Sequence, residues 1–342
     1  MTAGLVVPES RRGGHRIVSI GWLCAVVIVA APLALDLRGE LWGDVRVDLS
    51  TTTTRILSIG LAVLFAVALS RRLGGRALLP VVLVAGYGAV SIITGWPTLV
   101  AGGAAGLAVL SAALALMLTM PARTVGRAIL ETVIAGAVAT IGGLGVAGVD
   151  AGLHEDRFAA VVLLVTLFGA FVMVFRLGAG FHGLGRRGYV VAAGATTLLV
   201  ISLLYGAAFS RWGSHDMVGA LDTVRDATRN HLYAVPHPIE ALLGVPALCW
   251  GSFMRARRRQ GWWVCAFGAA FTAPSTTRFV VSGVPASTSL ASIGYTLALG
   301  FALAWLVIRI DQRLTGSRGR RARRVEESDA LRPEPARFAP LR

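Results

Sequence analysis

Ten long apolar runs occupy more than half of this 342-residue chain. A helix needs about 20 mostly apolar residues to cross the roughly 30 Å hydrocarbon core of a bilayer. The runs are continuous rather than alternating, and a helix satisfies its own backbone polar groups, so helices are favoured over barrel strands. We therefore predict an all-α fold, a polytopic transmembrane helix bundle of about ten spans. The predicted spans are residues 17–35, 50–69, 77–94, 98–120, 128–149, 158–175, 189–209, 239–254, 262–281 and 288–308.

The distribution of charge supports this topology. The chain carries 33 basic and 18 acidic residues, a formal net charge of +15, and every basic residue is arginine. If the N-terminus is cytoplasmic, 25 arginines fall on the inner side, seven fall in outer segments, and Arg278 lies within a span. This asymmetry obeys the positive-inside rule. We predict a multi-pass protein of the plasma membrane with both termini in the cytoplasm, and the exclusive use of arginine favours a GC-rich bacterial genome.

The same pattern divides the chain into three parts. Residues 1–16 form a cytoplasmic N-terminal segment, residues 17–308 the ten-span domain, and residues 309–342 a basic, then acidic and proline-containing tail that we expect to be disordered. The first apolar run follows arginines as a signal peptide would, but it is longer than the usual cleavable core, so we expect it to remain as a span. The arginines beside the span ends are expected to contact anionic lipid headgroups at the cytoplasmic face, and no nucleic acid.

Several kinds of chemistry are excluded or disfavoured. Without lysine there is no phosphate-loop lysine and no Schiff-base lysine. The three cysteines lie within predicted spans without a CxxC pair, which disfavours disulfide and zinc frameworks. Two GxGxxG matches, at 143–148 and 178–183, follow no predicted strand and so do not predict a dinucleotide site. We therefore expect no cofactor and, from the cysteine pattern, no metal. Gly102 and Gly106 are expected to let the fourth span approach its neighbours closely.

Charged residues at membrane depth are candidates for function. Glu131 lies four residues after Arg127 on one helix face, which predicts either a local ion pair at the interface or a proton-coupled site. Glu240 and Arg278 lie at the outer ends of two consecutive spans. We hypothesise that they pair and line an outward-facing polar cavity; alternatively, a buried pair only fixes the register of the helical hairpin.

Two outer loops carry further candidates. Residues 36–49 have helical amphipathic periodicity, and their acidic stripe is either a solvated face or a cation site. Residues 210–238 are also partly amphipathic and contain three histidines. His231 and His237 could converge with Glu240 as a metal or acid–base site, although their spacing matches no ligand motif.

Three functions fit these features. The first is a small-molecule or lipid transporter whose polar cavity involves Glu240, Arg278, His231, His237 and Glu131. The second is a non-catalytic anchor that assembles membrane or envelope protein partners. The third is a transferase that uses a lipid-linked donor at the outer face, with an acid such as Asp36, Asp44 or Asp222. The sequence designates no catalytic residue and no substrate.

Overall fold

The computed structural model describes residues 9–37, 49–152, 155–177, 193–197, 200, 234–257, 261–280, 286–315 and 334–341. Within these ranges the chain forms helices and no strands. The elements are α1 (Glu9–Leu37), α2 (Thr51–Arg72), α3 (Leu78–Thr94), α4 (Pro97–Met117), α5 (Val125–Val149), α6 (Glu155–Arg176), the π-helical turn η3 (Glu240–Gly244), α9 (Val245–Arg255), α10 (Gly261–Ala266), α11 (Ala269–Thr277), the 3-10 turn η4 (Arg278–Val280) and α12 (Ala286–Thr315).

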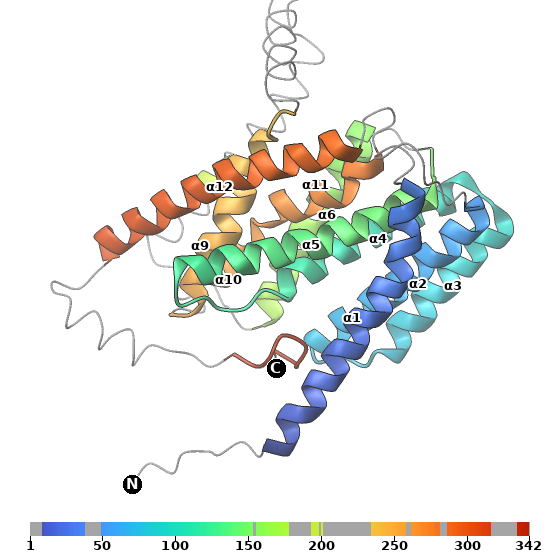
Figure 1. Cartoon of the computed structure of the whole chain (residues 1–342), viewed down its shortest axis with the longest axis horizontal. Coiled ribbons are helices and arrows are strands. Elements are labelled where there is room, and N and C mark those ends of the chain that lie inside the picture. The colour runs from blue at the N-terminus through green and yellow to red at the C-terminus, as the bar shows by residue number, and fades with distance from the viewer. Residues whose placement is uncertain are drawn as a thin grey trace, which may run out of the picture.

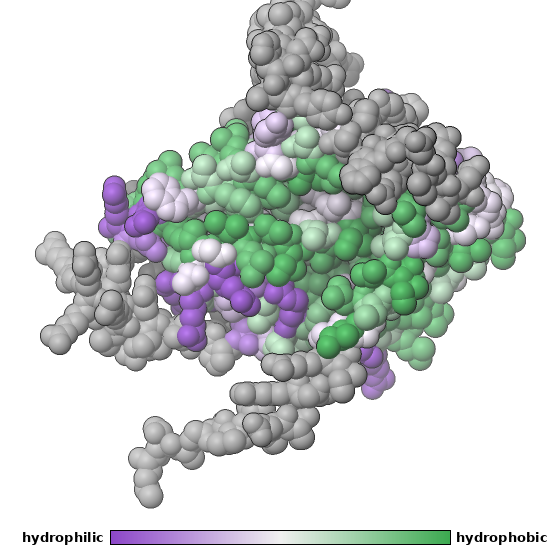
Figure 2. All heavy atoms as spheres, in the orientation of Figure 1, coloured by the Kyte–Doolittle hydropathy of each residue, from purple (hydrophilic) through white to green (hydrophobic). Residues whose placement is uncertain are grey.

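Six of the described helices are long and apolar enough to cross a membrane: α1, α2, α4, α5, α6 and α12. Their outward faces carry apolar side chains, as on α6, where Leu164 and Phe168 are exposed. Figure 2 shows hydrophobic surface over α12 and α5, and hydrophilic surface gathered where α12 ends and α5 begins. Exposure of so much apolar surface to water is unfavourable, whereas lipid chains can cover it. The chain therefore has the character of an integral membrane protein.

The antiparallel pair α4 and α5 forms the centre of the bundle (Figure 1). On one side α2 packs against both helices and carries α1 and α3. On the other side α11 contacts α4, α5 and α6, while α9 and α12 pack against each other. Every described residue of α11 except Pro274 is buried, because helices surround it.

Two sets of contacts define the ends of the bundle. At one end the Arg72 Nε donates to the Met117 carbonyl over 2.9 Å, and the Ala122 amide donates to the Ser252 carbonyl over 2.9 Å. At the other end the Arg55 Nε donates to the Val149 carbonyl over 3.0 Å. We call the first the arginine end and the second the opposite end. Helices α2, α4 and α9 run toward the arginine end, whereas α5 and α11 run away from it.

Small residues set the distance between helices on α5 and η3. On α4 they do so at one of the two predicted positions, since a Cβ on Gly102 would lie 2.3 Å from the Tyr87 hydroxyl of α3. A Cβ on Gly145 would lie 2.9 Å from both Leu61 and Leu107 side chains, and one on Gly244 would lie 2.3 Å from the Phe271 backbone nitrogen. A Cβ on Gly106 would meet nothing within 4 Å. The prediction that Gly102 and Gly106 bring helices together was therefore wrong for Gly106, because that residue faces open space rather than a neighbouring helix.

The ninth predicted span is broken about a third of the way along. The chain turns at residues 267–268, where backbone bonds reach back three residues, as from Gly268 N to the Cys265 carbonyl over 2.8 Å. The sequence predicted one helix over 262–281, and the structure instead gives α10, α11 and η4. At Gly268 a Cβ would lie 2.8 Å from the Cys265 carbonyl, so this turn depends on the absence of a side chain.

The end of the chain also differs from its prediction. Residues 334–341, here called the C-terminal segment, form a turn that packs on the arginine end, although the tail was expected to be disordered. Phe338 and Leu341 lie against the hydrophobic core formed by α1, α2 and α4. Composition does not indicate this turn, because the groups that hold it lie on helices distant in sequence.

Candidate functional site

The most deeply buried ion pair at the opposite end joins Glu240 of η3 to Arg278 of η4. The Arg278 Nη2 donates to both carboxylate oxygens of Glu240, at 2.5 Å and 2.6 Å. The Nη1 of Arg278 donates to the Ser292 hydroxyl of α12 over 3.1 Å, and that hydroxyl donates to the Val235 carbonyl over 2.6 Å. The contact hypothesised between Glu240 and Arg278 is therefore present in the structure.

Local sequence explains why these side chains meet. Pro236 and Pro238 favour an extended chain before the helix, and the chain then enters the π-helical turn η3 at Glu240. Arg278 follows α11 directly, and α12 presents polar Ser292 and Thr296 four residues apart on its buried face. The elements η3, η4 and α12 thus converge on one point, which we call the Glu240–Arg278 cluster: Glu240, Arg278, Ser292, Thr296 and His237.

The ion pair of the cluster is closed to solvent. The Glu240 side chain is 0% exposed and that of Arg278 is 5% exposed. The Nε of Arg278 is buried and has no hydrogen-bond partner within the described part of the chain. An unpaired buried donor of a charged group is costly, so this N–H is available to a water molecule or a ligand oxygen.

Between the cluster and the centre of the bundle, α11 carries three buried hydroxyl groups, those of Thr272, Ser275 and Thr276. Ser275 and Thr276 are buried and donate to carbonyls of their own helix, those of Phe271 and Ala273, over 2.7 Å in both cases. The Thr272 hydroxyl is buried without a partner among the described residues. The broken helix therefore presents polar groups at a depth where most side chains are apolar.

The other predicted cavity residues separate into three groups. His237 lies at the rim, with its Nδ1 3.8 Å from the Glu240 Oε1 and 53% of its side chain exposed. His231 lies outside the described residues. Glu131 is at the arginine end, twelve residues before Gly143, whose Cβ position meets the Ser275 and Thr276 carbonyls. Twelve helical residues span about 18 Å, so the structure places Glu131 far from Glu240 and Arg278 and does not bring the three together.

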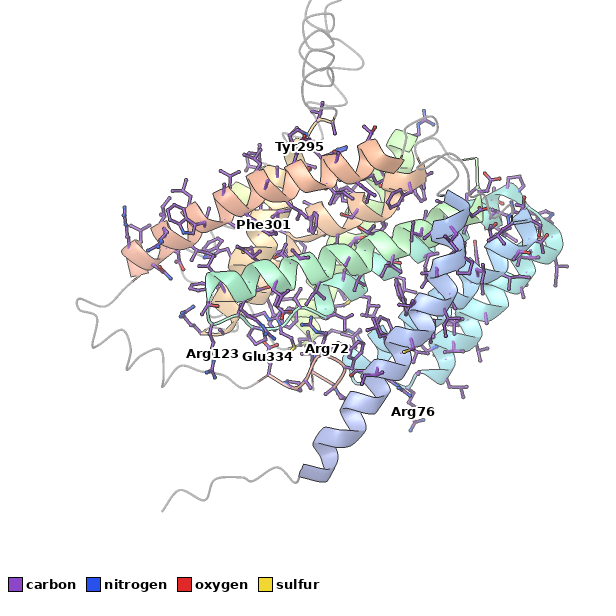
Figure 3. All side chains as sticks on the ribbon, in the orientation of Figure 1. Arg72, Arg76, Arg123, Tyr295, Phe301 and Glu334 are labelled. Carbon is purple, nitrogen blue, oxygen red and sulfur yellow. The ribbon has the colours of Figure 1, made fainter. Side chains whose placement is uncertain are left out.

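A second charged cluster lies at the arginine end, and the sequence indicated only its Arg127–Glu131 pair. Glu131 is buried, accepts a bond from the Met120 amide over 2.9 Å and pairs with Arg127 at 3.3 Å. Arg72 and Arg255 are buried as well. Figure 3 shows Arg72 and Glu334 where the C-terminal segment meets the bundle.

Sequence signals for the two clusters differ in strength. The buried face of α12 repeats every four residues, through Ser292, Thr296, Gly300, Ala304 and Ile308, and this spacing could have identified Ser292 and Thr296. Arg72 and Arg255 end spans as arginines do throughout the chain, so nothing in the sequence separates these buried arginines from exposed ones.

Of the acids proposed for a transferase, the structure describes Asp36 alone. Asp36 accepts a bond from the Leu49 amide over 3.1 Å, and so closes the loop between α1 and α2. Asp44 and Asp222 lie outside the described residues. Among the residues that the structure describes, no group of three or more histidine, cysteine or acidic side chains could hold a metal ion.

Comparison with known proteins adds no family to this description. No protein-family model, curated protein or solved structure matches the chain. Conclusions about function therefore rest on the two clusters and on the surrounding bundle.

Proposed function

We propose that the chain is a ten-span protein of the plasma membrane with both termini in the cytoplasm. The alternation of the described helices between the two ends supports this count. Phe171 of α6 lies beside Trp263, near the arginine end, whereas Val235 lies at the opposite end, which supports an odd number of crossings between α6 and Val235. The predicted span 189–209 supplies one crossing. The positive-inside rule then places the arginine end in the cytoplasm.

Within this topology we propose a transporter of a small molecule or lipid, whose outward-facing polar cavity opens at the Glu240–Arg278 cluster. The observation that carries the proposal is the broken helix α10–α11, which packs against the π-helical turn η3 at Gly244. Transporters commonly place substrate sites where discontinuous helices expose polar groups within the membrane. Here the break, the buried Thr272 hydroxyl, which has no partner among the described residues, and Arg278 follow one another along α10, α11 and η4.

The ion pair suits the role of an outer gate. Glu240 satisfies Arg278 in the closed state, and a substrate carboxylate or phosphate would offer Arg278 an alternative acceptor. Arg278 has a spare donor in its Nε, so it can engage such a group before it releases Glu240. Opening would expose the hydroxyl groups of α11 below the pair.

A second candidate is a membrane anchor for envelope partners. It is favoured because the Glu240–Arg278 ion pair is closed to solvent. A buried ion pair can fix the packing of two helices without any transport role. In this case Glu240 and Arg278 stay inaccessible at all times. The two functions therefore differ in whether water ever reaches α11 from outside.

Cysteine accessibility in intact cells tests this difference. In a background with Cys24, Cys249 and Cys265 replaced by alanine, Ser275→Cys is treated with a membrane-impermeant maleimide. Transport predicts slow but complete labelling, accelerated by Glu240→Gln because the closed state loses its ion pair. Thr51→Cys, on the exposed first turn of α2, is the positive control, and Leu299→Cys, on the outward face of α12, is the lipid-facing control. Labelling of Thr51→Cys alone would contradict the transporter and favour the anchor.

A further inference from the structure

We infer that the arginine end is a peptide-binding site whose ligand is the chain's own C-terminal segment, and that this segment clamps that end of the bundle. The inference goes beyond the proposed transport and does not rest on it. It rests on three buried charged side chains of the bundle and on the groups that residues 334–341 bring to them.

The site is organised by the bundle itself. The connection between α4 and α5 holds all three charged side chains through its backbone. Arg255 donates from Nη2 to the Thr119 carbonyl over 2.5 Å, and Glu131 accepts from the Met120 amide over 2.9 Å. Arg72 donates to the Met117 carbonyl at the end of α4. Because these bonds lie within the bundle, the site does not depend on the ligand for its geometry.

The charged side chains of the C-terminal segment are complementary to those of the site. Glu334 takes two bonds from Arg255, at 3.2 Å from Nε and 3.0 Å from Nη2. Arg337 reaches both oxygens of Glu131, at 2.8 Å and 2.9 Å, and donates to the Leu118 carbonyl over 2.7 Å. Two bidentate pairs of opposite polarity, three residues apart, give the peptide a direction and a register.

Backbone and apolar contacts complete the recognition. The Nη1 of Arg72 donates to the carbonyls of Ala336 and Ala339, over 2.8 Å and 2.9 Å, and the Leu341 amide donates to the Arg72 carbonyl over 2.9 Å. The Phe338 ring lies 5.0 Å from that of Trp22 in α1. The segment thus joins α1, α2, α5 and α9, which are far apart in sequence.

The clamp has a defined consequence when it is released. Arg72 would lose the Ala336 and Ala339 carbonyls and keep the Met117 carbonyl and the Met120 sulfur. Arg255 would lose its carboxylate partner and keep the Thr119 carbonyl and hydroxyl. Loss of some acceptors is costly for a buried guanidinium group, so the open end would favour rebinding of the segment over remaining empty. The ligand class that the site accepts is a short peptide with an acidic residue, a basic residue three positions later and an adjacent aromatic residue.

The test cuts the full-length protein after it has folded. A recognition site for a sequence-specific protease is placed within residues 316–333, and the purified protein is cleaved in nanodiscs of zwitterionic lipid. We expect the fragment that carries residues 334–341 to remain bound, as measured by mass spectrometry after size exclusion. A fluorescent peptide of residues 334–342 should then exchange with it, and a peptide of scrambled order should not.

Single substitutions distinguish the effect of the two ion pairs from the effect of the net charge of the tail. Glu334→Gln and Arg337→Gln should each speed dissociation of the fragment by about tenfold or more, since each removes a charge-assisted bidentate contact. Glu327→Gln and Arg342→Gln remove the same charges from residues outside the C-terminal segment and should change the rate less than about twofold.

Two results would overturn the inference. One is a fragment that leaves at once in the unsubstituted protein, or that leaves equally fast in all four variants. The other is a fragment retained in zwitterionic nanodiscs but displaced in nanodiscs containing phosphatidylglycerol, which would make the site one for lipid headgroups rather than for the chain's own segment.

Discussion

The guanidinium of Arg278 holds both oxygens of the Glu240 carboxylate through a single nitrogen, across 38 residues of sequence. Its second terminal nitrogen is held by Ser292, so η3, η4 and α12 meet at one buried charge pair. This relationship fixes the opposite end of the bundle. It also supplies the first of four predictions.

Replacing one member of the Glu240–Arg278 pair should lower the free energy of unfolding much more than replacing both members. Arg278→Leu leaves the buried Glu240 carboxylate unpaired, and we expect the free energy of unfolding to fall by about 3–5 kcal/mol. Glu240→Leu/Arg278→Leu should recover most of that loss, because buried apolar pairs of similar volume are tolerated. Thermal unfolding in detergent measures both variants. His237→Ala removes the half-exposed neighbour of Glu240 and should lower the free energy of unfolding less than Arg278→Leu does.

The hydroxyl of Ser292 should matter through two neighbours at once. Ser292→Ala removes the acceptor of the Arg278 Nη1 and the donor to the Val235 carbonyl. A buried group left unsatisfied costs about 1–3 kcal/mol, so the unfolding midpoint should fall measurably. Thr94→Val removes a hydroxyl on the exposed end of α3 and should leave the midpoint unchanged. Equal midpoints for the two variants would contradict the importance of Ser292.

The close approach of η3 to α11 predicts intolerance of a single methyl group. At Gly244 a Cβ would lie 2.3 Å from the Phe271 nitrogen and 2.6 Å from the Ala270 carbonyl carbon, and backbone atoms cannot move aside as side-chain ends do. Gly244→Ala should cost about 1–3 kcal/mol or prevent accumulation of the folded protein. Gly106→Ala, where a Cβ meets nothing within 4 Å, is the matched control in α4 and should accumulate normally. Quantitative fluorescence-detected size exclusion compares the two.

Glu131 should contribute far more to stability than its helical partner Arg127. Glu131 is buried and receives bonds from the Met120 amide and from Arg337, whereas 56% of the Arg127 side chain is exposed. Glu131→Ala should lower the free energy of unfolding by about 3–5 kcal/mol because it leaves the Met120 amide without its acceptor and Arg337 without its buried partner. Arg127→Gln should lower it by less than about 1 kcal/mol. Comparable losses would show that Glu131 acts only through the local pair.

The sequence-based predictions agree best with the structure where they concern the bounds of a single helix. The span predicted at 128–149 lies within α5, and the one at 77–94 matches α3 nearly to the residue, because length and hydropathy are local properties. Agreement fails where a second segment is involved. Nothing in residues 262–281 predicted the break at Gly268, and nothing near Glu131 indicated that Arg337 would reach it from 206 residues away.

By itself, the sequence determined that this protein is an all-helical, lipid-facing bundle, because continuous apolar runs and flanking arginines allow little else. It also brought Glu240 and Arg278 to attention, since a charge within an apolar run needs a partner. Only the tertiary structure decided which charges are buried. Arg72 and Arg255 look like ordinary flanking arginines, yet both are enclosed beneath the C-terminal segment. Burial is a property of neighbours distant in sequence, and a linear pattern does not record those neighbours.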